Sequence, residues 1–148
     1  MITYYASNRI LQAMFGKQSS VSLAQNCYLA LSSTKPNADG TNVTEPSGNG
    51  YARKLIGSYS QAATQAMGNP SDGEITNTLE IHFDAATGSW GTLPYACIYD
   101  AATSGNLLAA GNILDSGGSA TSISPVANSV VVLKVNSLNF SITGTALT

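Results

Sequence analysis

The stretch Leu79-Glu80-Ile81-His82-Phe83 decides the fold class, because apolar and polar residues alternate along it with a period of two. This alternation is typical of a β-strand that turns one face to a core and the other to solvent. His82, the single histidine of the sequence, falls on the polar side. We therefore expect it to be a solvent-facing or interface residue rather than a base or a metal ligand.

Similar segments lie on both sides of this stretch, separated by turns rich in Gly, Pro, Asn, Asp and Ser. The sequence predicts about eight short strands, at residues 27–31, 51–59, 61–67, 74–83, 93–99, 106–113, 129–135 and 139–145. The segment 61–67 would also suit a short helix, because it is rich in Ala and Gln. The continuously apolar run Val130-Val131-Val132-Leu133 is typical of a strand covered on both faces. This pattern predicts an all-β fold, a jelly-roll-like sandwich of two sheets.

One short N-terminal helix is expected, over residues 7–16. Ser7 is the expected N-cap and Gly16 the expected end. Between them, apolar residues recur with helical spacing, at Ile10, Leu11, Met14 and Phe15. About two turns of helix are not stable alone in water, so we expect this stripe to pack on another surface.

The composition is unusually poor in charge. The chain of 148 residues has the size of one domain, 1–148, and 9% of its residues are charged, compared with about 25% in an ordinary soluble domain. Six Lys and Arg and a net charge of −2 argue against a nucleic-acid partner, and no apolar run reaches the about 18 residues of a membrane span. We expect much of the surface to be covered by further copies of the chain or by a larger assembly. A Ser/Thr-rich secreted β domain is the alternative.

A long polar loop, residues 35–50, connects the first two predicted strands. Loops of this length commonly bind, cover or assemble something. Glu45 and Arg53 lie on either side of Tyr51, and we expect the two charges to pair across the base of the loop. Residues 37–42 have a passing likeness to a calcium loop but lack its acidic series and final Glu, so no metal is expected.

No catalytic motif or cofactor site is expected. A glycan hydrolase, the enzyme alternative, needs two converging carboxylates, and nothing in the spacing of Asp72 and Glu74 or of Asp84 and Asp100 brings them together. A Ser-His-Asp triad would have to use His82, and the sequence has no Gly-x-Ser-x-Gly elbow.

The cysteines and the tryptophan are expected to be packing residues. Cys27 and Cys97 lie in apolar alternating segments, which suits buried free thiols; a disulfide between them stays open. Trp90 is expected to close one end of the sandwich. In the alternative, its exposed ring stacks on a sugar together with Tyr95 or Tyr99.

Several motifs, in their order along the chain, carry a resemblance to a known family. They are Asn8-Arg9-Ile10-Leu11, Glu45-Pro46-Ser47-Gly48, Gly50-Tyr51-Ala52-Arg53, Trp90-Gly91 and Asp100-Ala101-Ala102-Thr103. From about residue 8 to 142, the chain resembles small virion proteins of tailed bacteriophages and prophages, usually labelled tail fibre or minor structural proteins.

The resemblance implies a structural protein that folds in the host bacterial cytoplasm and assembles into the virion. In agreement, the first five residues lack the basic and apolar regions of a signal peptide. We expect a capsid-surface decoration or fibre-anchoring protein, with a tail fibre or tail-tip component that binds host carbohydrate as the alternative. The expected partners are other virion proteins and further copies of the chain in a homotrimer, and the candidate interface residues are Glu45, Tyr51, Arg53 and Trp90.

Overall fold

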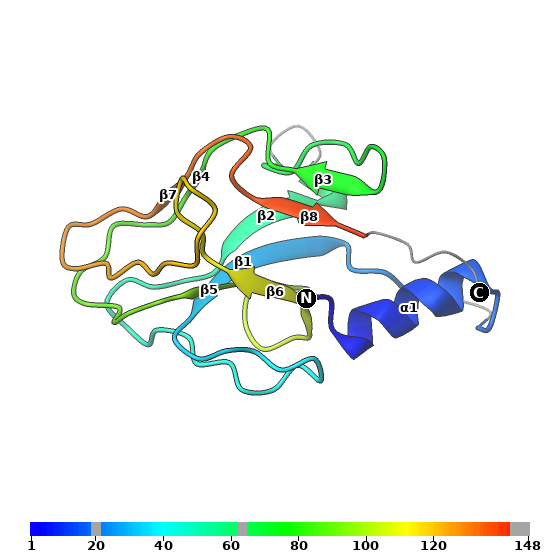
Figure 1. Cartoon of the computed structure of the whole chain (residues 1–148). Coiled ribbons are helices and arrows are strands. Elements are labelled where there is room, and N and C mark those ends of the chain that lie inside the picture. The colour runs from blue at the N-terminus through cyan, green and yellow to red at the C-terminus, as the bar shows by residue number, and fades with distance from the viewer. Residues whose placement is uncertain (19–21, 62–64, 143–148) are drawn as a thin grey trace.

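A computed structural model of the chain describes residues 1–18, 22–61 and 65–142 (Figure 1). Its base is a four-stranded antiparallel sheet in the order β2-β1-β5-β6. The bounds of these strands are Asn26–Ser32 (β1), Lys54–Ser58 (β2), Tyr95–Tyr99 (β5) and Leu107–Asn112 (β6). The predicted strands at 27–31, 93–99 and 106–113 correspond to β1, β5 and β6.

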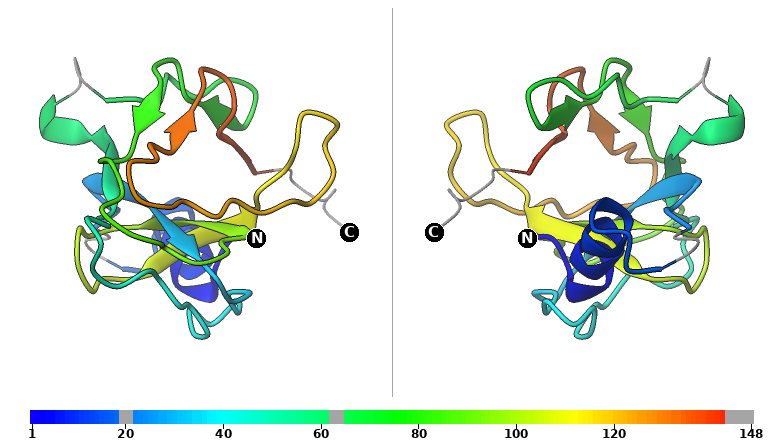
Figure 2. Two further views of the ribbon diagram at one scale, coloured as in Figure 1. Left: turned by 90° about the vertical axis from the view of Figure 1, so that its left-hand side faces the viewer. Right: turned by 90° about the vertical axis from the view of Figure 1, so that its right-hand side faces the viewer.

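A second layer lies over one face of this sheet (Figures 1 and 2). It contains two antiparallel two-stranded ladders, β3-β8 and β4-β7. Their bounds are Glu74–Thr76 (β3), Ile81–His82 (β4), Val132–Leu133 (β7) and Asn139–Ser141 (β8). The fold is therefore all-β and sandwich-like, as predicted, with two short ladders in place of one continuous second sheet.

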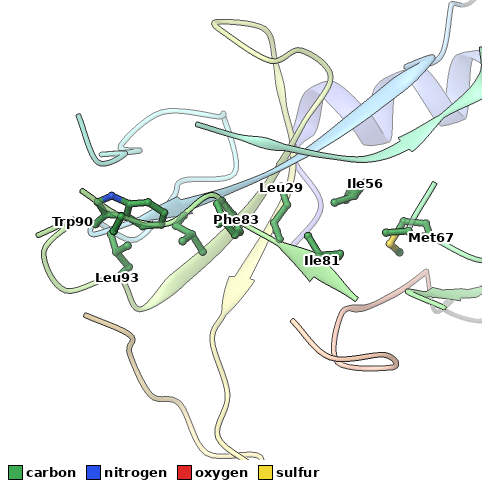
Figure 3. Packing of buried hydrophobic residues seen from close by; sticks show 10 residues of the cluster. Leu29, Ile56, Met67, Ile81, Phe83, Trp90 and Leu93 are labelled. Atoms are coloured by element: carbon green, nitrogen blue, oxygen red, sulfur yellow. The ribbon is translucent and has the colours of Figure 1, made fainter. Parts of the chain in front are cut away.

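The main core fills the space between the two layers (Figure 3). Leu29 of β1 pairs with Ile98 of β5, and both face this core. Ala30 and Cys97, the next pair in the register, face the opposite side of the sheet, where they join a smaller cluster with Val43 of the long loop. The sheet is thus covered on both faces, on one of them by the loop 35–50.

The predicted strand 74–83 is divided in two at Asn77. Its side chain is fully buried and donates to the carbonyls of Leu79 and Lys134, at 2.8 Å each, while its Oδ1 accepts from the backbone N–H of Leu138 at 2.8 Å. A side chain that replaces ladder hydrogen bonds in this way ends β3 and lets the chain turn before β4.

Four other predicted strands are shorter than expected, one of them 129–135, of which β7 covers Val132–Leu133. Of the segment 51–59, β2 retains Lys54–Ser58, and a 3₁₀-helix, η1 (Tyr59–Gln61), follows it. In the segment 61–67, positions 62–64 lie outside the described residues, and Met67 forms only an isolated bridge to Asn77. In the segment 139–145, β8 covers Asn139–Ser141, and positions 143–145 lie outside the described residues.

The prediction that the run 130–133 is covered on both faces is wrong. Val130 and Val132 are 50% and 40% exposed, whereas Val131 and Leu133 pack against the main core. The physical reason is that β7 lies in a two-stranded ladder, which has one face on the core and the other toward solvent.

The N-terminal helix α1 spans Tyr4–Met14, so it begins three residues earlier than predicted. Its N-cap is Thr3 rather than Ser7, because the Thr3 Oγ accepts from the backbone N–H of Ala6 at 3.3 Å. The same hydroxyl donates to the carbonyl of Leu107 at 2.6 Å. The cap therefore also ties the helix to β6.

The predicted apolar stripe of the helix is not buried in the chain. Ile10 is half-buried, but Leu11, Met14 and Phe15 are 51%, 71% and 66% exposed. Figure 1 shows α1 running outward from the edge of the sheet, where only one of its faces meets the body. Within the chain, the stripe is therefore covered only at Ile10, and packing of its other members on another surface stays a prediction.

Candidate functional site

Arg53, which directly precedes β2, forms an ion pair with Glu45 of the long loop. Its Nε lies 3.1 Å from each carboxylate oxygen of Glu45, and its Nη2 lies 2.6 Å from Oε1. The Arg53 side chain is 9% exposed and that of Glu45 is 21% exposed. The predicted pairing is confirmed, and the pair is more buried than a surface salt bridge.

The remaining bonds of Arg53 reach the turn between β5 and β6. Nη1 donates to the carbonyls of Ala101 at 2.9 Å and Ser104 at 2.7 Å, and the guanidinium lies 3.5 Å from the centre of the Tyr99 ring. Burial alone would lower the pKa of Arg53, but the hydrogen bonds and charge of Glu45 outweigh burial and raise it. One side chain thus joins the long loop, β2 and the β5–β6 turn.

Tyr51 connects this ion pair to the sheet. Its hydroxyl donates to Oε2 of Glu45 at 3.0 Å and accepts from the backbone N–H of Leu31 at 2.9 Å. Burial and the nearby Glu45 carboxylate raise the pKa of Tyr51 above its ordinary value. The phenol therefore stays protonated and keeps donating to Glu45.

Tyr51 also belongs to an aromatic cluster with Phe83 and Trp90. The Tyr51 and Trp90 ring centres lie 5.2 Å apart at an interplanar angle of 85°, and Phe83 lies about equally close to both. The Trp90 Nε1–H donates to the carbonyl of Asn49 at 2.8 Å, and Trp90 is 5% exposed. Trp90 is a packing residue, as expected, and its ring is not available to stack on a sugar; Tyr99, at 7% exposed, is buried as well.

The structure brings all four predicted site residues together. Glu45, Tyr51 and Arg53 form one hydrogen-bonded network, and Trp90 joins it through the ring of Tyr51. This arrangement holds the base of the long loop in place: the carboxylate is bound by a guanidinium and a phenol and is not free for acid–base chemistry. A contact between these residues and another chain stays a prediction.

A polar pocket that no sequence motif predicts lies beside this network. The pocket has a volume of about 290 Å³ and is lined by Tyr5 of α1, Asp39 of the long loop, and Arg53, Tyr99 and Asn106 among others. Hydrogen bonds from Thr41 hold the pKa of Asp39 below its ordinary value. No local motif marks this pocket, because its walls come from segments far apart in the sequence.

A second missed surface is the outer side of α1. Exposed apolar side chains gather there, which we call the α1 stripe: Tyr4, Leu11, Met14 and Phe15. The other side of α1 lines an apolar groove of about 290 Å³ that reaches Ile56, Ile98 and Phe140. The helical spacing of Leu11, Met14 and Phe15 in the sequence predicts the stripe, but it does not predict that these side chains are exposed.

The four carboxylates considered for catalysis each contact a different polar partner. Asp72 accepts from the Ser71 hydroxyl at 2.9 Å, and Glu74 accepts from the side-chain amide of Asn139 at 3.5 Å. Asp84 pairs with Lys54 at 3.0 Å, and Asp100 accepts from the backbone N–H and side chain of Asn106 at 2.6 and 2.8 Å. Within residues 1–18, 22–61 and 65–142, no three His, Cys, Asp or Glu side chains lie close enough to share a metal ion. His82 is exposed and pairs with Glu80 at 2.9 Å.

Over the same described part of the chain, no helix is long and apolar enough to cross a membrane.

Cys27 and Cys97 are both free thiols and face opposite sides of the sheet, toward the main core and the smaller cluster respectively. Burial, followed by the charge of Glu45, raises the pKa of Cys97 to about 12.

The fold and the network define a small all-β protein with a long loop anchored on its sheet. A family model described as "Podophage GP4 fiber I protein gp80" matches residues 1–141. The chain belongs to this family, and the membership makes it a structural or fibre protein of a tailed phage, as the resemblance implies. No curated protein matches the chain.

Proposed function

We propose that the protein is a compact subunit that anchors a fibre to the virion, and that it works through assembly and not through catalysis. The observation that carries this proposal is the α1 stripe, which exposes Leu11, Met14 and Phe15 to water at 51%, 71% and 66%. Contiguous exposed apolar side chains mark surfaces that a partner covers. The scarcity of charge, at 9% of residues, supports the same conclusion. A surface with so little charge favours association of the free chain with a partner.

Self-association belongs to this proposal. Virion proteins commonly assemble by symmetry, and the resemblance to phage virion proteins supports a homotrimer. The fibre description of the family favours a fibre-anchoring role over decoration of the capsid surface. The compact sandwich also suits an anchor better than a shaft, which is built from extended repeats.

Electron microscopy of phage particles that carry a label on this protein tests the proposal. A few copies where fibres join the particle are the expected result. Many copies spread over the head would overturn it in favour of capsid decoration. Particles without any label would overturn both roles.

A second candidate function is binding of host carbohydrate, and the polar pocket supports it. Sugars are commonly bound by an aromatic ring beside polar groups that form hydrogen bonds. Tyr5 is 36% exposed, and Asp39 and Asn106 line the same pocket. A glycan array with the wild-type chain and the Asn106→Ala variant tests this function: binding that the variant loses supports it, and no binding by the wild type refutes it.

A further inference from the structure

The α1 stripe follows one line along the helix. At 3.6 residues per turn, positions 4, 11 and 15 project in nearly the same direction, with position 14 beside them. Tyr4 and Phe15 are 64% and 66% exposed, so the stripe is open over the length of α1. Tyr4, Leu11 and Phe15 face away from the side of the helix that carries Ala6 and Arg9, which line the apolar groove. Met14 lies one turn after Ile10, at the border between the two sides.

The stripe carries no charge. Arg9 is the single charged residue of α1, and it lies on the groove side, where its guanidinium is 5.4 Å from the centre of the Tyr5 ring. When identical surfaces meet across a symmetry axis, each residue lies near its own equivalents. A charged stripe would then repel its copies, whereas an uncharged one does not.

The helix is mounted firmly on the sheet. Ile2 forms an antiparallel bridge with Ala109 at the edge of β6, and the N–H of Tyr4 donates to the carbonyl of Ala38 at 2.9 Å. Thr3 adds its hydroxyl bond to Leu107. A partner that binds the stripe therefore does not have to order the helix first, which lowers the entropic cost of binding.

We propose that the α1 stripe is the surface through which copies of this chain contact one another, helix against helix around a symmetry axis. This inference rests on the proposed function and names the interface of its assembly. The four side chains expose on the order of 500 Å², which is most of the about 800 Å² that each partner buries in a standard interface. A second copy fits this surface because it supplies an equally apolar, uncharged and rigid stripe.

Sedimentation of the purified full chain at micromolar to millimolar concentration tests the inference. The wild type is expected to form an oligomer, and the double variant Leu11→Gln/Phe15→Gln is expected to associate at least roughly a hundredfold more weakly. Its melting temperature should stay near that of the wild type, because both side chains are largely exposed. The matched control is Leu79→Gln/Val126→Gln, which alters side chains that are 50% and 58% exposed elsewhere, and it should associate like the wild type.

Two results would overturn the inference. One is a wild type that stays monomeric over the whole concentration range. The other is an α1 double variant that retains the oligomer of the wild type, which would place the interface elsewhere. Both are distinguishable from failure of the proposed function, because labelled particles report separately whether the protein is part of the virion.

Discussion

Arg53 holds three segments of the chain together through one side chain, and Glu45 neutralises it. Removal of one partner from a buried ion pair leaves the other charge buried and unpaired, which costs about 3–5 kcal/mol when both are fully buried. Glu45 is 21% exposed, so Glu45→Gln is expected to lower the free energy of unfolding by roughly 2–3 kcal/mol. Urea denaturation measures this change.

The matched control is the surface pair of Lys54 and Asp84, in which Asp84 is 71% exposed. Asp84→Asn is expected to change the free energy of unfolding by less than about 0.5 kcal/mol. Equal effects of the two variants would contradict the structural role of the Glu45–Arg53 pair.

Trp90 packs against Tyr51 and Phe83 in the core. We expect Trp90→Ala to lower the free energy of unfolding by about 3–5 kcal/mol, a large part of the about 5–15 kcal/mol that stabilises a domain. Thermal denaturation measures the loss, and Tyr95→Ala, at a half-buried strand position, is a milder comparison. A Trp90→Ala variant that melts like the wild type but no longer binds the cell surface would refute the packing role.

Tyr51 is expected to make the free energy of unfolding depend on pH in the alkaline range. Burial raises the pKa of Tyr51 above its ordinary value of 10.0, so the folded chain keeps a proton that the unfolded chain releases above pH 10. Its contribution to stability is complete below that pH and is lost as the pH rises further. Urea denaturation should show falling stability above about pH 10, with a smaller fall in Tyr51→Phe. The same slope in both proteins would contradict this prediction.

The position of α1 depends on its true N-cap, Thr3. Loss of an N-cap costs about 0.5–2 kcal/mol, and Thr3 also bonds Leu107 in the body of the protein. We therefore expect Thr3→Val to lower the free energy of unfolding by about 1–2 kcal/mol. Ser7→Ala should have almost no effect, because its hydroxyl donates to the carbonyl of Tyr4 in an exposed position. A larger effect at Ser7 than at Thr3 in urea denaturation would contradict the observed start of the helix.

The two cysteines lie on opposite faces of the four-stranded sheet. Cys27 packs toward the main core, while Cys97 faces the smaller cluster on the other side of the same sheet. We expect both to remain reduced in the assembled particle. Intact mass after denaturation and alkylation without reductant checks this: two added labels are expected, and an unlabelled chain lighter by two hydrogens would contradict it.

The network at the base of the long loop joins segments that lie far apart along the chain. Its ion pair was predictable, because Glu45 and Arg53 flank Tyr51 closely in the sequence. The contacts of Arg53 with Ala101 and Ser104 were not, because they join positions about 50 residues apart. The polar pocket was hidden for the same reason, since α1, the long loop and the β5–β6 turn form it together.

The sequence by itself determined where the main sheet strands lie, which class of fold they form and which family the protein resembles. Alternation of apolar and polar residues is a local property, so it identified β1, β5 and β6 with small errors at their ends. Only the tertiary structure decided which apolar residues become buried. The spacing of Leu11 and Phe15 and the run at Val130–Leu133 both predict burial, yet α1 rests on a sheet edge and β7 lies in a two-stranded ladder, so each has one face without a neighbour. Burial depends on what lies opposite a side chain, and that is set by contacts between segments far apart along the chain.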